Sequence, residues 1–322
     1  MTRDVPMSDR MHAWRPVVGL CAYLAAAIAG GALVAFPAYT ALSRVADPAF
    51  DSVLHRVAAV TLLVMLPLYL ASGRRAPARA REARPLRTLM TRETFGFGSS
   101  APAFRRGLVR GFALGVLVVS PLIAAFLMLG VRAPAEVATS PADIAAFAAY
   151  ALIAALAIGL IEESYFRGAL LAPLRELPPA LSVSIVSVVY AAVHFIGAPL
   201  PGDDLGWSSG FASIARSEIP LDAFLALFAA GLFLGALRIR FEHIGVSAGF
   251  HAGWVWLMKL NQAYTDVVPD SAWRMLEGSY GGTMGTLGLV WIALLGIGWY
   301  AIDRARARGK SRDELAKTRM AR

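Results

Sequence analysis

Residues 150–174 read YALIAALAIGLIEESYFRGALLAPL, an apolar run broken only by a short cluster of charged side chains. A helix rises roughly 1.5 Å per residue, so about 20 apolar residues cross the roughly 30 Å hydrocarbon core of a bilayer. The stretch therefore predicts a helix that spans a membrane. The same test, applied outward along the chain, predicts eight spans, at residues 16–40, 53–72, 107–130, 144–172, 179–198, 221–238, 244–260 and 283–302.

The composition agrees with a protein whose solvent is lipid. Of the 322 residues, 57% are hydrophobic and 16% are charged, and the mean hydropathy is +0.57. A soluble fold of this length does not need so much apolar surface. We therefore predict an all-α fold class, a polytopic transmembrane helical bundle with about eight spans. The single cysteine, Cys21, excludes an intramolecular disulfide and a cysteine-based metal site.

The net charge of +9 comes mainly from two basic stretches, residues 73–106 and the tail after Tyr300. They carry no nucleic-acid motif and no interleaved aromatic residues, so we expect no nucleic-acid partner. Basic residues collect on the cytoplasmic side of membrane proteins. We therefore expect an integral protein of a bacterial inner (plasma) membrane, with both termini cytoplasmic.

The basic stretches also suggest how the chain is divided. Residues 1–106 would form two transmembrane helices and a basic cytoplasmic loop, and residues 107–302 a six-helix membrane domain. Residues 303–322 would form a basic cytoplasmic tail. No segment outside the spans is long enough for a soluble catalytic domain, so any chemistry must lie in or at the membrane.

Few ionisable groups interrupt the apolar runs: Glu162, Glu163 and Arg167 in one span, His194 in the next and His251 in the span at residues 244–260. Ionisable groups inside a membrane are costly and usually mark function. Adjacent glutamates point about 100° apart on a helix, whereas residues four apart share a face. Glu163 and Arg167 are thus expected to form a buried ion pair, which leaves Glu162, or a displaced Glu163, to hold water or metal.

Simpler interpretations exist for each group taken alone. If the fourth span ended at Ile161, the charged cluster would be a solvated salt bridge at a helix end. Either histidine could be a packing residue bonded to a backbone carbonyl. Separate packing roles are harder to assume when all of these groups lie on neighbouring helices. Their depths in the membrane, counted along the helices at roughly 1.5 Å per residue, nevertheless differ by several ångströms.

The residue types permit two kinds of hydrolysis. A glutamate can take a proton from the water that attacks an amide while a histidine stabilises the oxyanion. Alternatively, Glu162, His194 and His251 could bind a catalytic zinc that activates the water. The sequence does not choose between these, but it contains no HExxH motif and no GxSG motif.

These residues resemble the CPBP family of intramembrane proteases, also called the Abi or CAAX protease and bacteriocin-processing family. The EExxxR motif stands as EESYFR, FxxxH as YAAVH with Tyr190 in the Phe position, and HxxxN as HAGWV with Val255 in the polar position, within a core at about residues 150–260. The resemblance implies an intramembrane endopeptidase, annotated in the family as a metalloprotease.

By the same resemblance, the catalytic residues would be Glu162, Glu163, His194 and His251, with the glutamates activating water and Arg167 structural. A divalent metal such as zinc would help to activate the water, or a glutamate would activate it without metal. The expected partners are the lipid bilayer and a hydrophobic or lipid-anchored peptide substrate. The alternatives are a catalytically inactive member that binds peptides, acts in immunity or serves as a scaffold, and a transporter with a Glu and His proton relay.

Overall fold

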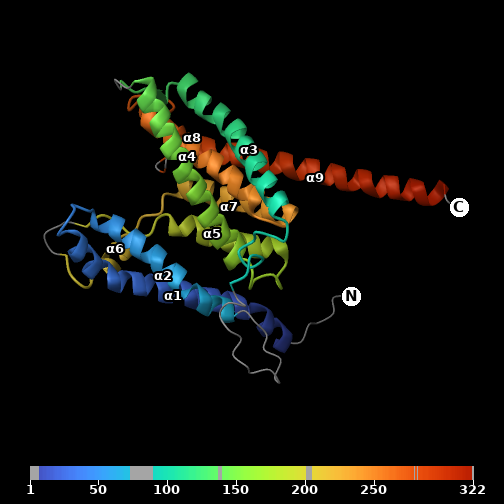
Figure 1. The fold of residues 1–322 in the computed structure, drawn as a ribbon, viewed down its shortest axis with the longest axis horizontal. Helices are drawn as coiled ribbons and strands as arrows, with labels where there is room; N and C mark the ends of the chain where they lie inside the picture. Colours follow the sequence, from blue (N-terminus) through green and yellow to red (C-terminus); the bar gives the residue numbers. More distant parts are fainter. Residues whose placement is uncertain are drawn as a thin grey trace.

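The computed structural model describes residues 7–72, 90–136, 140–200, 205–278, 280 and 282–320. The described chain is a bundle of helices (Figure 1), as the predicted fold class requires. In chain order the α-helices are α1 (Met7–Leu42), α2 (Phe50–Ser72), α3 (Ala101–Met128), α4 (Pro141–Glu163), α5 (Pro179–Val193), α6 (Ser209–Ala215), α7 (Leu221–Phe241), α8 (Gly245–Tyr264) and α9 (Thr286–Met320).

Each predicted span lies on one of these helices, and within the described ranges five helices are long and apolar enough to cross a membrane by themselves. They are Trp14–Leu42, Phe50–Ala71, Ala101–Met128, Pro141–Leu170 and Leu221–Phe241. Two more predicted spans fall on the shorter apolar helices Pro179–Val193 and Thr286–Ile302. The predicted polytopic helical membrane bundle is confirmed.

Helix α8 covers the remaining predicted span but differs in character from the other long helices. Every residue from Gly245 to Val255 is buried, and this half of the helix is rich in glycine, alanine and serine. Because protein rather than lipid surrounds it, α8 can replace large apolar residues by small and polar ones. It is the helix that carries His251.

Several boundaries differ from the predicted ones. Helix α3 begins at Ala101 instead of residue 107, because the Ser100 hydroxyl accepts a hydrogen bond from the Ala103 amide and caps the helix. Helix α9 continues to Met320, so the backbone of the predicted tail extends the last span as one helix. Half of the predicted basic loop, residues 73–89, lies outside the described residues.

Several small elements were not predicted, among them a strand pair and a 3₁₀ turn. Strand β1 (Arg132–Pro134) pairs antiparallel with β2 (Thr265–Val267), with Arg132 opposite Val267 and Pro134 opposite Thr265. The pair joins the end of α3 to the end of α8. A 3₁₀ turn, η4 (Arg274–Leu276), lies in the connection from β2 to α9.

Helices α3 and α8 pack backbone to backbone through glycines. A Cβ at Gly111 would lie 2.2 Å from the Val246 carbonyl oxygen, and one at Gly249 would lie 2.0 Å from the Leu108 carbonyl oxygen. Small residues on both helices therefore permit an approach that any larger side chain would block. The close approach that the small residues around His251 suggested is present.

The first two helices form an antiparallel pair, which Figure 1 shows in blue beneath the green helices. They join the rest of the bundle through tyrosines: the Tyr23 and Tyr165 hydroxyls share a hydrogen bond of 2.7 Å, and the Tyr69 hydroxyl donates to the Leu170 carbonyl at 3.0 Å. Both contacts end on the segment that directly follows α4. The division of the chain at residue 106 stays a prediction.

Candidate active site

The charged cluster stands where α4 changes its winding. Glu162 and Glu163 are the last residues of α4, and residues Ser164–Leu170 continue as the π-helix η2. Such turns are rare and often occur at functional sites. A Cβ at Gly168 would lie 2.4 Å from the Phe95 backbone, so only glycine lets the segment before α3 pack directly against this turn.

Glu163 and Arg167 form a fully buried ion pair. The Arg167 Nη1 to Glu163 Oε1 distance is 2.7 Å, and the side chains are 1% and 0% exposed. Arg167 also donates to the Gly231 carbonyl at 3.3 Å, and its guanidinium lies 4.3 Å from the centre of the Tyr190 ring. The cluster is therefore not a solvated salt bridge at a helix end.

His251 reaches both glutamates from α8. Its Nδ1 lies 3.2 Å from Glu163 Oε1, and its Nε2 lies 3.8 Å from Glu162 Oε2. Helix α8 comes this close to α4 because Gly159 faces Ala248 and Ala252, where a Cβ would lie 2.7 Å from the Ala248 carbonyl oxygen. The difference in depth along the two helices thus does not keep these groups apart.

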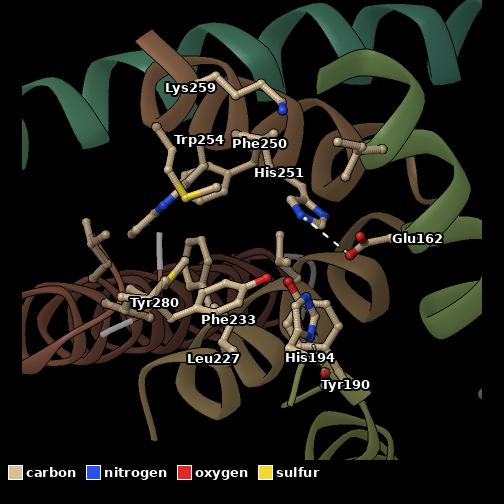
Figure 2. A pocket seen from close by; sticks show the side chains of 18 residues that line it. Glu162, Tyr190, His194, Leu227, Phe233, Phe250, His251, Trp254, Lys259 and Tyr280 are labelled. Carbon is tan, nitrogen blue, oxygen red and sulfur yellow. Dashed lines mark hydrogen bonds and ion pairs between the residues drawn. The ribbon is translucent and has the colours of Figure 1, made fainter. Parts of the chain in front are cut away.

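His194 immediately follows α5 and has no contact with the glutamates within hydrogen-bonding distance. Its Nδ1 lies 2.6 Å from the Tyr190 carbonyl oxygen, and because a carbonyl can only accept, Nδ1 carries the proton. Its ring packs edge-on against Tyr190 at 4.8 Å and Tyr280 at 5.6 Å between centroids. In Figure 2 His194 lies across the cavity from His251.

Glu162, His194 and His251 line one cavity of about 250 Å³, whose walls are mainly apolar. Its polar side chains are Glu162, Tyr190, His194, His251, Lys259 and Tyr280. Among its apolar side chains is Val255, one helical turn beyond His251. Glu162 is the only glutamate that faces the cavity, and 29% of its side chain is exposed. An exposed carboxylate beside a histidine in an apolar cavity can polarise a water molecule.

A second cavity, of about 460 Å³, meets the first at Glu162, His194 and Tyr280. Its other walls come from α2, with Ala58, Leu62 and neighbouring residues, and from the segments near Ile161 and Val193. The helix pair α1 and α2 therefore helps to enclose space beside the site. The glutamate and histidine stand at the junction of two apolar spaces.

The ligand set expected for zinc does not come together. Within the described part of the chain, no three His, Cys, Asp or Glu side chains are arranged to hold a metal ion. His194 donates from Nδ1 to a backbone carbonyl and His251 from Nδ1 to Glu163, so Nε2 is the nitrogen of each ring that remains for a ligand. The metal stays a prediction, and the chemistry below uses side chains alone.

The sequence reasoning missed Tyr280, which belongs to the connection between α8 and α9 and lines both cavities. A lone tyrosine between two helices carries no periodic signal, so nothing in the sequence pointed to it. The resemblance identifies Tyr190 only as the residue in the Phe position of the FxxxH motif, and it predicts no role for the hydroxyl.

The fold is that of a polytopic helical membrane protein, and its buried glutamate and histidine cluster faces a mainly apolar cavity. Residues 144–257 match the family model of type II CAAX prenyl endopeptidase Rce1-like proteins. The match covers Glu162, Glu163, Arg167, His194 and His251, and it confirms the resemblance to the CAAX protease family. At the level of the family it supports an intramembrane endopeptidase. Neither a curated protein nor a solved structure matches the chain.

Proposed function

We propose that the protein is an intramembrane endopeptidase in which Glu162 activates the attacking water. The observation that carries this proposal is the unequal state of the two glutamates. Glu163 is fully buried and bound by Arg167 and His251, whereas Glu162 faces the cavity with its Oε2 3.8 Å from His251 Nε2. Of the two glutamates, Glu162 lines the cavity, and its Oε2 has no hydrogen-bond partner among the described residues.

The gap between Glu162 and His251 suits a shared water. A separation of 3.8 Å is too long for a direct hydrogen bond, but a water can bond to both groups at once. The Glu163 carboxylate accepts from His251 Nδ1, so in the neutral form of the ring Nε2 presents a lone pair. Both groups would then accept the hydrogens of one water and orient its oxygen toward a carbonyl.

The reaction follows from these positions. Glu162 takes a proton from the water as the water oxygen bonds to the amide carbon, which produces a tetrahedral oxyanion. The carbon–nitrogen bond then breaks while Glu162 returns the proton to the leaving nitrogen. The products are a carboxylic acid and an amine, and Glu162 is again a carboxylate. Glu163 and Arg167 hold the turn, and His251, in place.

The cavities support the expected substrate, a hydrophobic or lipid-anchored peptide. The walls around Glu162 are apolar on both sides, with Leu227, Phe233 and Phe250 in the first cavity and Leu62 and Leu63 in the second. Apolar segments gain free energy on entering such space, at roughly 25 cal/mol per Å² buried. The basic stretches support an inner-membrane location with both termini cytoplasmic.

The test is cleavage of membrane-embedded peptides, with and without C-terminal lipidation, by purified protein. Wild type should cut a subset of the peptides, and Glu162→Gln and His251→Ala should abolish cutting while the proteins stay folded. Glu163→Gln and His194→Ala complete the series. A rate that a chelator leaves unchanged would support activation of the water by side chains alone, and loss of cutting with chelator would favour the predicted metal. Failure of folded wild type to cut any peptide would contradict the proposal.

A catalytically inactive member of the family is the second candidate, and Val255 favours it. Its side chain is 6% exposed, lines the cavity and offers no hydrogen-bond donor. An inactive protein would still bind apolar peptides, and Glu162→Gln would not change their affinity by more than a few fold. Binding without cleavage would decide for this candidate.

A further inference from the structure

Amide hydrolysis needs hydrogen-bond donors aimed at the developing oxyanion, and these contribute much of the rate. The glutamate and histidine cluster presents mainly acceptors to the cavity. Nδ1 of His194 is bonded to the Tyr190 carbonyl and Nδ1 of His251 to Glu163, so in their neutral forms both rings turn a lone pair at Nε2 toward the cavity. Glu162 is an acceptor, and Val255 has no polar atom.

Two tyrosine hydroxyls remain near this cluster. Tyr190 and Tyr280 both line the cavity, and neither hydroxyl is hydrogen-bonded to any residue that the structure describes. The Tyr190 ring lies 4.8 Å from the His194 ring and 6.2 Å from the His251 ring, and the Tyr280 ring lies 5.6 Å from His194, all between centroids. Figure 2 shows both tyrosines on the His194 side of the cavity, facing His251.

The other donors of the cavity are less suited. Lys259 lies eight residues after His251 on α8, a rise of about 12 Å along the helix axis at roughly 1.5 Å per residue. Figure 2 places it far from Tyr280 and His194. The Trp254 Nε1 is covered by surrounding atoms and does not reach the open space.

The two tyrosines are held from different directions. The Tyr190 ring is fixed between the Arg167 guanidinium, at 4.3 Å, and the Phe166 ring, at 5.1 Å between centroids. The Tyr280 ring packs edge-on against Phe195 at 5.7 Å and against His194. Burial also raises the pKa of Tyr280 to about 12, so this hydroxyl keeps its proton at neutral pH.

A buried ion cluster fixes the connection that carries Tyr280. Glu277, three residues earlier, pairs through one oxygen with Arg132 and through the other with Arg274 at 2.7 Å. Arg132 also donates from Nε to the Thr265 hydroxyl at 2.6 Å. The strand pair β1 and β2 and this cluster thus tie the connection to the ends of α3 and α8. Tyr280 is presented by a braced segment.

We propose that the hydroxyls of Tyr190 and Tyr280 form the oxyanion hole of this site, donating to the oxygen of the tetrahedral intermediate as water attacks. This assignment rests on the proposed endopeptidase function. Two donors from α5 and from the connection before α9 replace the polar group that Val255 lacks. The histidines then bind and orient water, and the tyrosines stabilise the charge.

The test is steady-state cleavage of a peptide that wild type cuts, measured for Tyr190→Phe, Tyr280→Phe and the double variant. Phenylalanine removes one oxygen and keeps the ring contacts with Arg167 and His194. Each single variant should lower kcat about 100-fold with KM changed less than threefold, because an oxyanion donor acts in the transition state. Tyr264→Phe, a partly buried tyrosine outside both cavities, is the matched control and should match wild type.

The outcomes distinguish failure of the oxyanion-hole assignment from failure of the proposed endopeptidase function. If wild type cuts, Glu162→Gln does not, and both phenylalanine variants keep kcat within threefold, the oxyanion hole is wrong while the endopeptidase stands. A rise in KM alone would also overturn the assignment, since it would indicate substrate binding. If wild type cuts nothing, the proposed function and this assignment fail together.

Discussion

At the residue scale, Glu162 and Glu163 are adjacent in the chain but have different surroundings. Glu163 is fully buried and ion-paired, whereas Glu162 faces a cavity. A buried charge that loses its partner is costly, by about 3–5 kcal/mol. The two glutamates should therefore separate into one that is needed for folding and one that is needed for chemistry.

We expect Glu163→Gln to lower the thermal unfolding temperature, since it leaves Arg167 buried without a carboxylate. Glu162→Gln should unfold at the wild-type temperature and yet cut no peptide. Thermal unfolding in detergent, followed by tryptophan fluorescence, measures the first effect and peptide cleavage the second. Equal stability of the two variants would mean that the Glu163 pair does not hold the turn.

Val255 gives a residue-scale test of the missing donor. It lines the cavity one turn beyond His251, so Val255→Asn would place an amide near the reacting groups. In a Tyr280→Phe background we expect Val255→Asn to raise kcat about tenfold, because a new donor replaces the lost one. Val255→Leu in the same background, which adds no donor, should give no recovery. Recovery with leucine as well would indicate a packing effect.

How much the sequence could predict also differs from residue to residue. Charged side chains inside apolar runs are conspicuous, so Glu162, Glu163 and His251 could be grouped, and the structure brings them within 3.8 Å. The sequence left open whether Glu162 or a displaced Glu163 is free to hold water, because the answer depends on how α8 packs against α4. Tyr280 belongs to an irregular segment. Because loops have no hydrophobic periodicity, no sequence pattern indicated it.

At the scale of elements, the glycines between α3 and α8 set the position of His251. We expect Gly249→Ala to lower the unfolding temperature and cleavage together, because its Cβ would meet the Leu108 carbonyl oxygen at 2.0 Å. Gly296→Ala on α9 is the matched control, since nothing lies within 4 Å of its Cβ position. If both variants behave like wild type, the close packing of α3 and α8 is not required.

The connection from β2 to α9 should depend on its buried ion cluster. Arg132 and Glu277 are 6% and 3% exposed, so Arg132→Met leaves Glu277 with only Arg274 and should loosen the segment. We expect faster amide hydrogen exchange in residues 268–285 and a kcat reduced about tenfold or more through Tyr280. Arg274→Met is the control, because that side chain is 45% exposed and its pair contributes little. Unchanged exchange in Arg132→Met would show that other contacts brace Tyr280.

At the scale of the whole molecule, hydropathy predicted the helical bundle because each span must bury its own backbone polar groups and expose apolar side chains to lipid. It was less informative where a helix is surrounded by protein. Helix α8 has the length of a span but the composition of an interior helix. The number of crossings therefore depends on α5, α8 and the first part of α9 as well as on the five long apolar helices.

The side of the membrane on which each terminus lies tests the number of crossings. Eight crossings place them on the same side of the membrane, whereas five would place them on opposite sides. Because the basic stretches at residues 73–106 and 303–322 both favour the cytoplasm, we expect both termini there. A C-terminal green fluorescent protein should fluoresce and a C-terminal alkaline phosphatase should be inactive, and an N-terminal epitope should be cut by protease only in inside-out vesicles. An active phosphatase, with the N-terminal epitope still cytoplasmic, would contradict eight crossings and require an odd number. At least one of α5, α8 and α9 would then lie within the bundle without crossing the membrane.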